Sequence, residues 1–155
     1  NLQMAKNSKP PTDGAFGHLD QQLCFSLYAA STAMTRLYRP LLEEMGITYP
    51  QYLALLVLWE KGSIRLGEIA EALNLASHAV SPIIDRLEHA GLARRINDPT
   101  DARAVLVELT KSGQKLKSSG GPIRDEVRKK TAMRTSEITR LRDELQRLVQ
   151  TLNEN

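Results

Sequence analysis

Residues 66–91, LGEIAEALNLASHAVSPIIDRLEHAG, decide the fold of this chain. Residues 66–73 predict a short helix, and Ser77 is expected to cap a second helix over about 77–90 that Gly91 closes. Two short helices joined by so tight a connection are typical of a helix-turn-helix, whose second helix is free to enter the major groove of DNA. The residues that follow strengthen this prediction.

A hairpin is expected directly after the second helix. Residues 92–96 and 104–109 are β-prone segments on either side of a polar loop, 97–103. Together they predict a protruding wing, in which Asp101 is either a turn residue or a carboxylate that holds Arg103 for the minor groove. The front of the second helix reaches base edges, and basic residues further along the helix and in the wing reach phosphates. The candidate DNA contacts are Ser77, His78, Ser81, Arg86, Arg94, Arg95, Asp101 and Arg103.

Amphipathic helices are expected before this unit. From Asp20, a good N-cap, apolar residues recur at three- and four-residue steps, and Pro40 is expected to kink or divide this helix before Gly46. Thr48 caps a second helix that runs through Trp59 and is apolar nearly all round. We expect that second helix to be buried.

Two further helices are expected after the wing. Thr110 caps a helix that the Gly120-Gly121-Pro122 run interrupts or kinks, and a last helix covers about 136–152. The apolar stripe of the last helix has little to cover within its own chain, and a symmetric operator needs two reading helices about 34 to 36 Å apart. The first and last helices are therefore expected to form a dimer interface. The predicted fold is mainly α with a small β-hairpin wing, a winged helix-turn-helix.

The composition is that of a folded protein. Hydrophobic residues make up 41% of the 155, enough for one domain with a core. The net charge of +3 permits nucleic-acid binding without requiring it. The single cysteine excludes a disulfide framework, and the sequence shows no signal peptide and no apolar run of about 18 residues. We expect a cytoplasmic protein without a membrane segment.

The domain organisation follows from these patterns. Residues 1–18 carry prolines, glycines and few apolar groups, which predicts a flexible tail. Met4 is a candidate native start, which would make residues 1–3 a cloning remnant. A single domain is expected over 19–152, with its winged helix-turn-helix core at about 48–110 and its dimerisation helices at about 20–46 and 110–152.

No residue pattern predicts catalysis. The histidines, acidic residues and cysteine show no convincing metal-ligand spacing, and neither a phosphate-binding loop nor a nucleophile-and-base motif rises above chance. We therefore expect no metal, no cofactor and no enzymatic activity.

Cys24 lies near the start of the first predicted helix. A lone thiol cannot close an internal disulfide, so it is either a packing residue or a reactive group. Peroxides react with the thiolate, which the positive end of a helix favours. Neutral phenols can donate hydrogen bonds to a thiolate, and Tyr28 lies one turn further on the same helical face. Tyr38 and Tyr49 could reach the thiol only through folding or from a second subunit.

Two sets of motifs carry a resemblance to a known family. This order of elements, with Gly91-Leu-Ala-Arg-Arg95 before the wing and Asp101-Ala-Arg103 in it, resembles the MarR family of winged-helix transcription regulators over about 20–152. The N-terminal stretches LCFSLY (23–28), LYRPL (37–41) and GITYPQYL (46–53) resemble the organic-hydroperoxide regulators, the OhrR branch of that family.

The resemblance implies a mechanism. It implies a homodimeric repressor of operator DNA that organic hydroperoxides inactivate through Cys24, with Tyr38 and Tyr49 reaching the cysteine across the dimer interface. Some members of the branch carry a second, resolving cysteine, and this chain has none. It therefore resembles the one-cysteine type, in which the sulfenic acid condenses with a low-molecular-weight thiol or is overoxidised.

Two other functions stay open. One is a regulator of the same fold that binds a small phenolic or lipophilic molecule at the dimer interface, with Cys24 as part of the pocket wall. The other is a thiol peroxidase, which would turn over with a reductant. The variant Cys24→Ser is expected to separate these alternatives from peroxide sensing.

Overall fold

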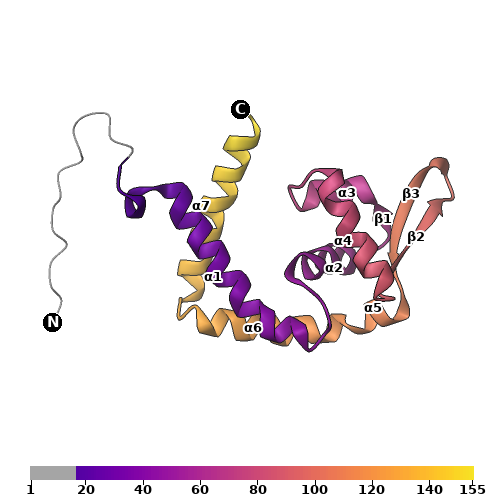
Figure 1. Cartoon of the computed structure of the whole chain (residues 1–155), viewed down its shortest axis with the longest axis horizontal. Coiled ribbons are helices and arrows are strands. Elements are labelled where there is room, and N and C mark those ends of the chain that lie inside the picture. The colour runs from indigo at the N-terminus through magenta and orange to yellow at the C-terminus, as the bar shows by residue number, and fades with distance from the viewer. Residues whose placement is uncertain (1–16) are drawn as a thin grey trace. The chain divides into compact units, whose positions relative to one another are not determined.

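The computed structural model describes residues 17–155 (Figure 1). The chain divides into two units, the first ending at Arg36 and the second beginning at Leu37. The expected tail lies outside the described residues, apart from Gly17 and His18. The predicted class, mainly α with a small β-hairpin wing, is confirmed, and a third short strand extends the hairpin into a sheet. The elements in chain order are η1 (Leu19–Gln21), α1 (Leu23–Glu43), α2 (Tyr49–Lys61), β1 (Ile64–Arg65), α3 (Leu66–Ala72), α4 (Ser77–His89), β2 (Ala93–Asp98), β3 (Asp101–Leu109), α5 (Lys111–Lys115), α6 (Lys117–Lys130) and α7 (Thr135–Asn153).

The first helix begins later than its sequence predicts. Asp20 lies inside the short 3₁₀ turn η1 instead of capping α1, which starts at Leu23. The turn is closed by the backbone N–H of Gln22, which donates to the carbonyl of Leu19 at 3.1 Å. Because the helix starts later, Cys24 is the second residue of α1 and lies in its first turn.

The helix α1 also continues through Pro40, so the alternative in which this proline divides it is wrong. A proline has no N–H to donate to the carbonyl one turn earlier, which here belongs to Arg36. The boundary between the two units falls directly after Arg36. The interrupted hydrogen-bond ladder of α1 thus coincides with the boundary between the units.

The core of the second unit is built around α2, as the apolar sequence of this helix predicts. Thr48 caps the helix by accepting a hydrogen bond from the backbone of Gln51, whose side chain accepts one from Thr48 N at 2.7 Å. Gly62 ends the helix with φ +75°. Burying these side chains together supplies most of the driving force for folding. The fully buried large side chains of the core are Leu42, Leu55, Leu58, Ile69, Ile84, Leu87, Val80 and Val107.

The helix-turn-helix forms from α3 and α4. Asn74 takes a left-handed φ of +54° in the connection, a conformation that asparagine tolerates better than most residues. Ser77 is the first residue of α4 and not its cap, because Ala76 occupies the cap position without a side-chain hydrogen bond. The buried side chains Val80, Ile84 and Leu87 fix the rotation of α4 against the core.

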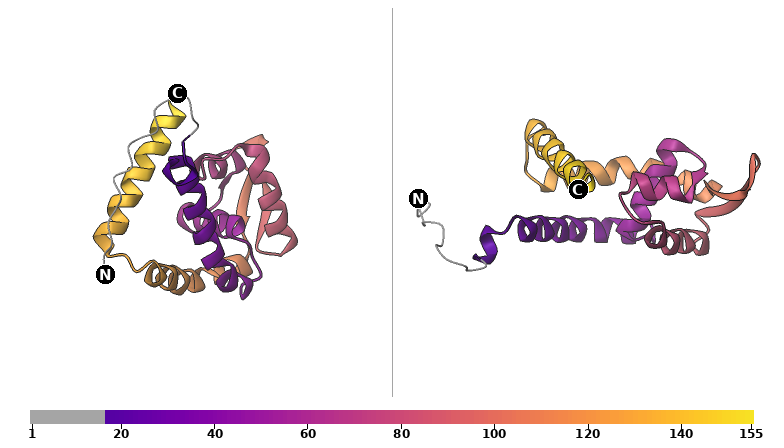
Figure 2. Two further views of the ribbon diagram at one scale, coloured as in Figure 1. Left: turned by 60° about the vertical axis from the view of Figure 1, so that its left-hand side comes forward. Right: turned by 90° about the horizontal axis from the view of Figure 1, so that it is seen from above.

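The wing is longer and tighter than its sequence predicts. The strands β2 and β3 pair antiparallel as far as Asp98 opposite Asp101, so only Pro99 and Thr100 lie between them. The carboxylate of Asp98 accepts the backbone N–H of Thr100 at 2.8 Å and thereby closes the turn. β1 adds to the other edge of β3, giving the order β1-β3-β2. The hairpin projects beyond α3 and α4 (Figures 1 and 2).

The C-terminal helices follow the prediction except at one point. Thr110 caps α5, as expected, by accepting the N–H of Gly113 at 3.1 Å. The irregular turn comes at Leu116, and α6 runs through residues 120–122, so the predicted interruption there is wrong. In a helix, the ring of a proline clashes with the carbonyl four residues earlier, which for Pro122 belongs to Ser118. The irregular turn at Leu116 lies two residues before that carbonyl.

The last helix, α7, spans Thr135–Asn153, close to its predicted range. None of its residues is buried, and three of its apolar side chains, Leu141, Val149 and Leu152, are at least 40% exposed. No helix within residues 17–155 is long and apolar enough to span a lipid bilayer.

Candidate functional site

The thiol of Cys24 is exposed in the first unit. Its place in the first turn of α1 puts it beside backbone N–H groups that have no partner inside the helix. Tyr28 follows one turn later and is 70% exposed. Both residues therefore lie on an open surface of α1, together with the exposed apolar side chains of Leu23 and Phe25.

The other two predicted tyrosines lie together in the second unit. The rings of Tyr38, near the end of α1, and Tyr49, at the start of α2, have their centroids 4.8 Å apart. A third ring, that of Tyr52, lies 5.7 Å from Tyr38 and 6.4 Å from Tyr49. Tyr52 was expected only as part of the buried run of α2. Its spacing of three residues from Tyr49 was the signal that could have identified it.

The phenols of this tyrosine cluster (Tyr38, Tyr49 and Tyr52) stay protonated at neutral pH. Burial, followed by the neighbouring phenols of Tyr49 and Tyr52, raises the pKa of Tyr38 to about 12. Burial also raises the pKa of Tyr49 and of Tyr52. The guanidinium of Arg124, on α6, acts in the opposite direction on Tyr38 and Tyr52, and it is outweighed. The cluster can therefore donate hydrogen bonds to an anion.

The front of α4 is an open polar surface. Ser77 and His78 are exposed at its first two positions, and Arg86 is exposed two turns later. No side chain caps the N-terminus of α4, so its first N–H groups stay available to an external acceptor such as a phosphate. The predicted base and phosphate contacts of this helix are thus exposed, with the exception of Ser81.

Ser81 and Arg95 are joined to each other. The Nη2 of Arg95, on β2, donates to the hydroxyl of Ser81 at 3.1 Å and to its carbonyl at 3.2 Å. Arg95 Nη1 forms ion pairs with Asp85, at 2.7 Å, and with Glu88. The side chain of Arg95 is only 27% exposed as a result. The structure therefore places this predicted wing contact against the flank of α4.

The remaining wing residues differ in their exposure and in their ion pairs. Arg94 faces Glu108 across the β2–β3 ladder and forms an ion pair with it. Arg103 has a side chain that is 93% exposed, and its Nε lies 3.6 Å from the carboxylate of Asp101. The same carboxylate accepts the backbone N–H of Arg103 at 3.0 Å. Asp101 is therefore the first residue of β3, directly after the turn, and its carboxylate contacts Arg103.

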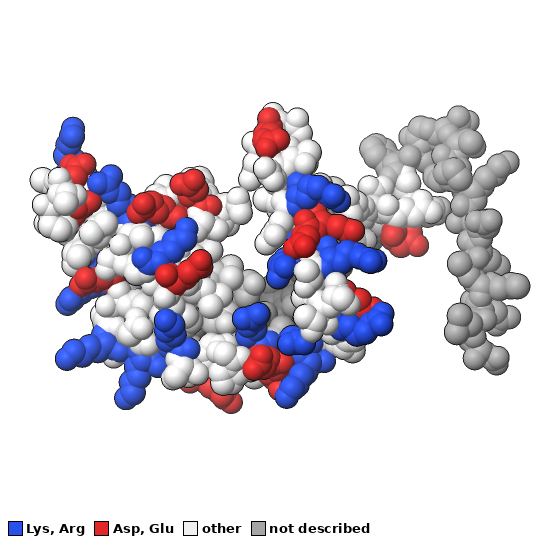
Figure 3. All heavy atoms as spheres, turned by 180° about the vertical axis from the view of Figure 1, so that it is seen from behind, with Lys and Arg blue, Asp and Glu red and all other residues white. Residues whose placement is uncertain are grey.

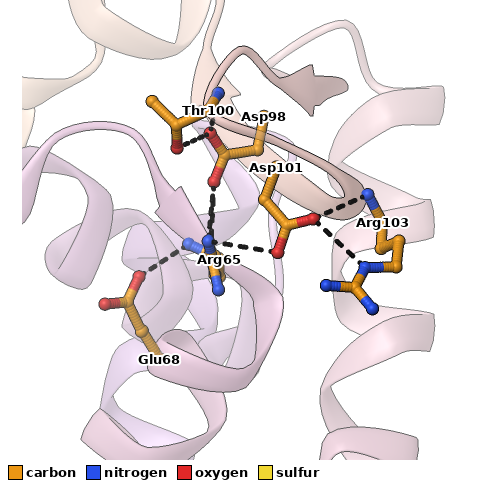
Figure 4. A network of polar contacts seen from close by, with 6 residues as sticks. All are labelled: Arg65, Glu68, Asp98, Thr100, Asp101 and Arg103. Carbon is orange, nitrogen blue, oxygen red and sulfur yellow. Dashed lines mark hydrogen bonds and ion pairs between the residues drawn. The ribbon is translucent and has the colours of Figure 1, made fainter.

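A network at the turn of the wing includes residues that sequence reasoning missed (Figure 4). Arg65, on β1, donates to Asp98 Oδ2 from Nη2 at 2.9 Å and from Nε at 3.3 Å. Its Nη2 also lies 4.0 Å from Asp101, while its backbone N–H donates to Glu68 at 2.8 Å. Figure 4 shows Asp101 between the guanidinium groups of Arg65 and Arg103. No local pattern marks the side chain of Arg65, because Asp98 and Asp101 lie more than 30 residues away.

Charges of both signs lie side by side on one face of the molecule. On the face shown in Figure 3, Lys and Arg side chains stand beside Asp and Glu side chains instead of forming one basic surface. Within residues 17–155, no group of three or more His, Cys, Asp or Glu side chains could hold a metal ion. Binding of a polyanion would therefore depend on a few particular cations and on how the nearby carboxylates are paired.

Comparisons with known proteins agree on one family. Residues 47–105 match the MarR family. The chain is 38% identical, over 144 residues, to the organic hydroperoxide resistance transcriptional regulator of Bacillus subtilis (strain 168). That match covers 92% of this chain and 98% of the relative.

Solved structures give the same result. The reduced form of AbfR bound to DNA has a TM-score of 0.70 and 32% identity, covering 86% of this chain and 94% of that one. The overoxidized form of AbfR bound to DNA matches with the same TM-score, identity and coverage. AbfR comes from Staphylococcus epidermidis.

Proposed function

Because this chain belongs to the MarR family of transcriptional regulators, we propose that it is a dimeric repressor that organic hydroperoxides inactivate through Cys24. The observation that carries the proposal is the exposed thiol of Cys24 in the first turn of α1. It occurs in a chain with high similarity, over nearly its whole length, to a regulator named for organic hydroperoxide resistance. The protein acts on DNA and is therefore proposed to be cytoplasmic.

The proposed chemistry takes two steps. The Cys24 thiolate attacks one peroxide oxygen, the O–O bond breaks, and the other oxygen leaves and takes up a proton as an alcohol. The sulfur is oxidised by two electrons to a sulfenic acid, and the peroxide is reduced. A low-molecular-weight thiol then attacks the sulfenic sulfur, which forms an S–S bond and releases water. The product is a mixed disulfide on Cys24.

The tyrosines have a proposed role in the first step. Tyr28 lies on the same face of α1 as Cys24, whereas Tyr38 and Tyr49 belong to the tyrosine cluster of the second unit. We assign Tyr38 and Tyr49 to the cysteine of the other subunit. A neutral phenol donates a hydrogen bond to a thiolate without bringing charge into an apolar pocket, and the raised pKa of Tyr38 keeps its phenol neutral.

Exposed apolar side chains support the dimer. At the start of α1, Leu23 is 61% exposed, and at the end of α7, Leu152 is 62% exposed. Apolar surface of this kind on an amphipathic helix commonly marks an interface, and a two-fold dimer presents the same surface twice. The proposed occupant of both surfaces is a second copy of this chain.

The proposed DNA contacts are the accessible ones. Ser77 and His78 at the front of α4 are proposed to meet base edges, and Arg86 a phosphate. Arg103 is proposed to enter the minor groove at the tip of the wing, steered by Asp101.

The mixed disulfide is the proposed releasing state. AbfR has been solved in its overoxidized form bound to DNA, so overoxidation is compatible with binding in that relative. For this chain we therefore favour condensation with a small thiol, which adds bulk at the proposed interface, over overoxidation. The added group would loosen the dimer and move the two α4 helices out of register with the operator.

One experiment tests the whole proposal. The full chain first selects its operator from a library of randomised duplexes, and a palindromic sequence is expected. Binding is then measured after one equivalent of cumene hydroperoxide, with and without added free cysteine, and intact mass is recorded in parallel. Release should accompany a mass increase of one cysteine less two hydrogens. Cys24→Ser should bind the operator and keep binding it after oxidant.

Three outcomes would contradict this proposal. Wild-type protein without any mass change would exclude oxidation. Release of Cys24→Ser by cumene hydroperoxide would exclude Cys24 as the sensor and favour a ligand pocket. Repeated consumption of peroxide in the presence of a reductant would identify a thiol peroxidase.

A further inference from the structure

Arg95 lies along one side of α4 and contacts three of its turns. Ser81, Asp85 and Glu88 are spaced four and three residues apart, so they form one stripe along that helix. The guanidinium reaches all three side chains. The backbone N–H of Arg95 also donates to Glu88 at 3.2 Å, which joins β2 to α4 independently of the side chain.

The stripe carries negative charge on the helix that is proposed to enter the major groove. Asp85 has a side chain that is 64% exposed, so its charge faces solvent, and Glu88 is 35% exposed. A carboxylate held near the phosphates of DNA is repelled, because like charges brought together in an interface are costly. Arg95 forms ion pairs with both carboxylates.

The arginine is held in its charged form. Burial disfavours the charge, but hydrogen bonds from the guanidinium to Glu88 and Asp85 outweigh that effect and raise the pKa of Arg95. Its donors are directed at the helix and not outward, in contrast to those of Arg103, whose side chain is almost fully exposed.

We propose that Arg95 is a positioning residue that fixes α4 to the wing and neutralises the Asp85–Glu88 stripe, so that the helix can approach DNA. This inference rests on the proposed function. It assigns Arg95 a role different from a direct phosphate contact, and the assignment rests on its contacts with α4. Ser81 is held by the same guanidinium, which orients its hydroxyl at the front of the helix.

A cycle of variants tests the proposal. The proteins are wild type, Arg95→Gln, the double variant Asp85→Asn/Glu88→Gln, and the triple variant that combines all three substitutions. Binding to the selected operator duplex is measured by fluorescence anisotropy at 0.1 M salt. Circular dichroism melting confirms that each protein is folded at the assay temperature.

The expected result is coupling between Arg95 and the stripe. Arg95→Gln should weaken binding about 10- to 100-fold. The triple variant should bind within about threefold of the double variant, because Arg95 has no charge left to offset there. Should Arg95→Gln melt below the assay temperature, Arg95→Lys carries the same cycle with a smaller expected loss.

Arg94→Gln is the matched control. It removes the same charge from the neighbouring position of β2, but its partner is Glu108 on β3 and not α4. Arg94→Gln should change the affinity for the operator by the same factor in the wild-type and the double-variant backgrounds, because its partner does not lie on α4.

Each contrary outcome has a distinct meaning. If Arg95→Gln weakens operator binding by the same factor in the wild-type and double-variant backgrounds, Arg95 contacts DNA directly and the inference is overturned. Unchanged binding by Arg95→Gln overturns it as well. If the wild-type protein selects no duplex, the proposed function itself fails and the inference fails with it.

Discussion

Arg65 Nη2 lies 2.9 Å from Asp98 Oδ2, and this ion pair ties β1 to the turn of the wing. The other carboxylate oxygen of Asp98 accepts the hydroxyl of Thr100 at 2.7 Å and its backbone N–H at 2.8 Å. These two bonds from Thr100, followed by that from Arg65, lower the pKa of Asp98 to about 2. The geometry of the wing therefore depends on an ionised carboxylate.

Asp98 should make the stability of the protein depend on pH in the acid range. Its pKa is lower in the folded chain than the ordinary value of 3.8, so its contribution is complete above that value and is lost as the pH falls towards 2. The measurement is urea unfolding of wild type and Asp98→Asn between pH 2 and 6. The difference in unfolding free energy should be largest above about pH 5 and should shrink below pH 4. A difference that stays constant across this range would contradict the assignment.

Gly113 should not tolerate a larger side chain. A Cβ at this position would lie 2.0 Å from the backbone carbonyl oxygen of Leu92, which cannot move without disturbing its hydrogen bond from Thr110 N. The carbonyl of Gly113 also accepts the indole N–H of Trp59 at 3.0 Å. We expect Gly113→Ala to lower the free energy of unfolding by about 2 to 4 kcal/mol in urea titrations.

Gly121 provides the matched control for that prediction. It lies inside α6, and a Cβ there would meet nothing within 4 Å. Alanine is the better helix former, so Gly121→Ala should raise stability by about 0.5 to 1 kcal/mol. Similar losses in both variants would show that the contact with Leu92 is not the cause.

Removing single hydroxyl groups should separate the proposed roles of the tyrosines. Tyr38→Phe and Tyr49→Phe should each slow oxidation of Cys24 by cumene hydroperoxide about tenfold, because a hydrogen bond to a charged group contributes roughly 1.5 to 3 kcal/mol. The rate is measured by quenched intact-mass analysis at pH 7. Tyr52→Phe is the control. The ring of Tyr52 is buried against Trp59, so this variant should react within about twofold of wild type. Equal rates of Cys24 oxidation in all three variants would show that the hydroxyls of Tyr38 and Tyr49 have no special role in the reaction.

Arg103 should contribute to operator binding through its charge. Arg103→Ala is expected to weaken binding and to reduce the slope of log affinity against log salt by about one. Asp101→Asn should weaken binding because the side chain of Arg103 is no longer held in one orientation. It should leave the slope of log affinity against log salt unchanged, because the guanidinium of Arg103 is still present. A slope that is the same for Arg103→Ala and wild type would exclude a phosphate contact.

Much of the fold could be predicted because its signals are local. The spacing of apolar residues in α4 and α7, the cap at Thr48 and the glycine stop at Gly62 each act within one or two turns. Errors occurred where two local signals competed. Asp20 is a good cap that lies in a 3₁₀ turn instead, and Pro122 is a helix breaker that α6 accommodates.

The sequence proposes residues for the candidate site but does not show which of them pair with one another. The motifs named Cys24, Tyr38, Tyr49, Arg95 and Arg103, yet no pattern in the sequence could show which arginine is free. Arg95 and Arg103 look alike in the sequence, and only the approach of β2 to α4 engages the first and leaves the second in solvent.

The sequence by itself determined the order of helices, the helix-turn-helix and its wing, and the single thiol near the start of a helix. These depend on hydrogen bonds and apolar periodicity within short segments. Tertiary structure alone decided that Tyr38, Tyr49 and Tyr52 share one cluster and that Arg65 anchors Asp98. It also decided that Arg95 binds Asp85 and Glu88. The physical reason is that an ion pair or a ring contact depends on distance in space, which folding sets for residues far apart in the chain.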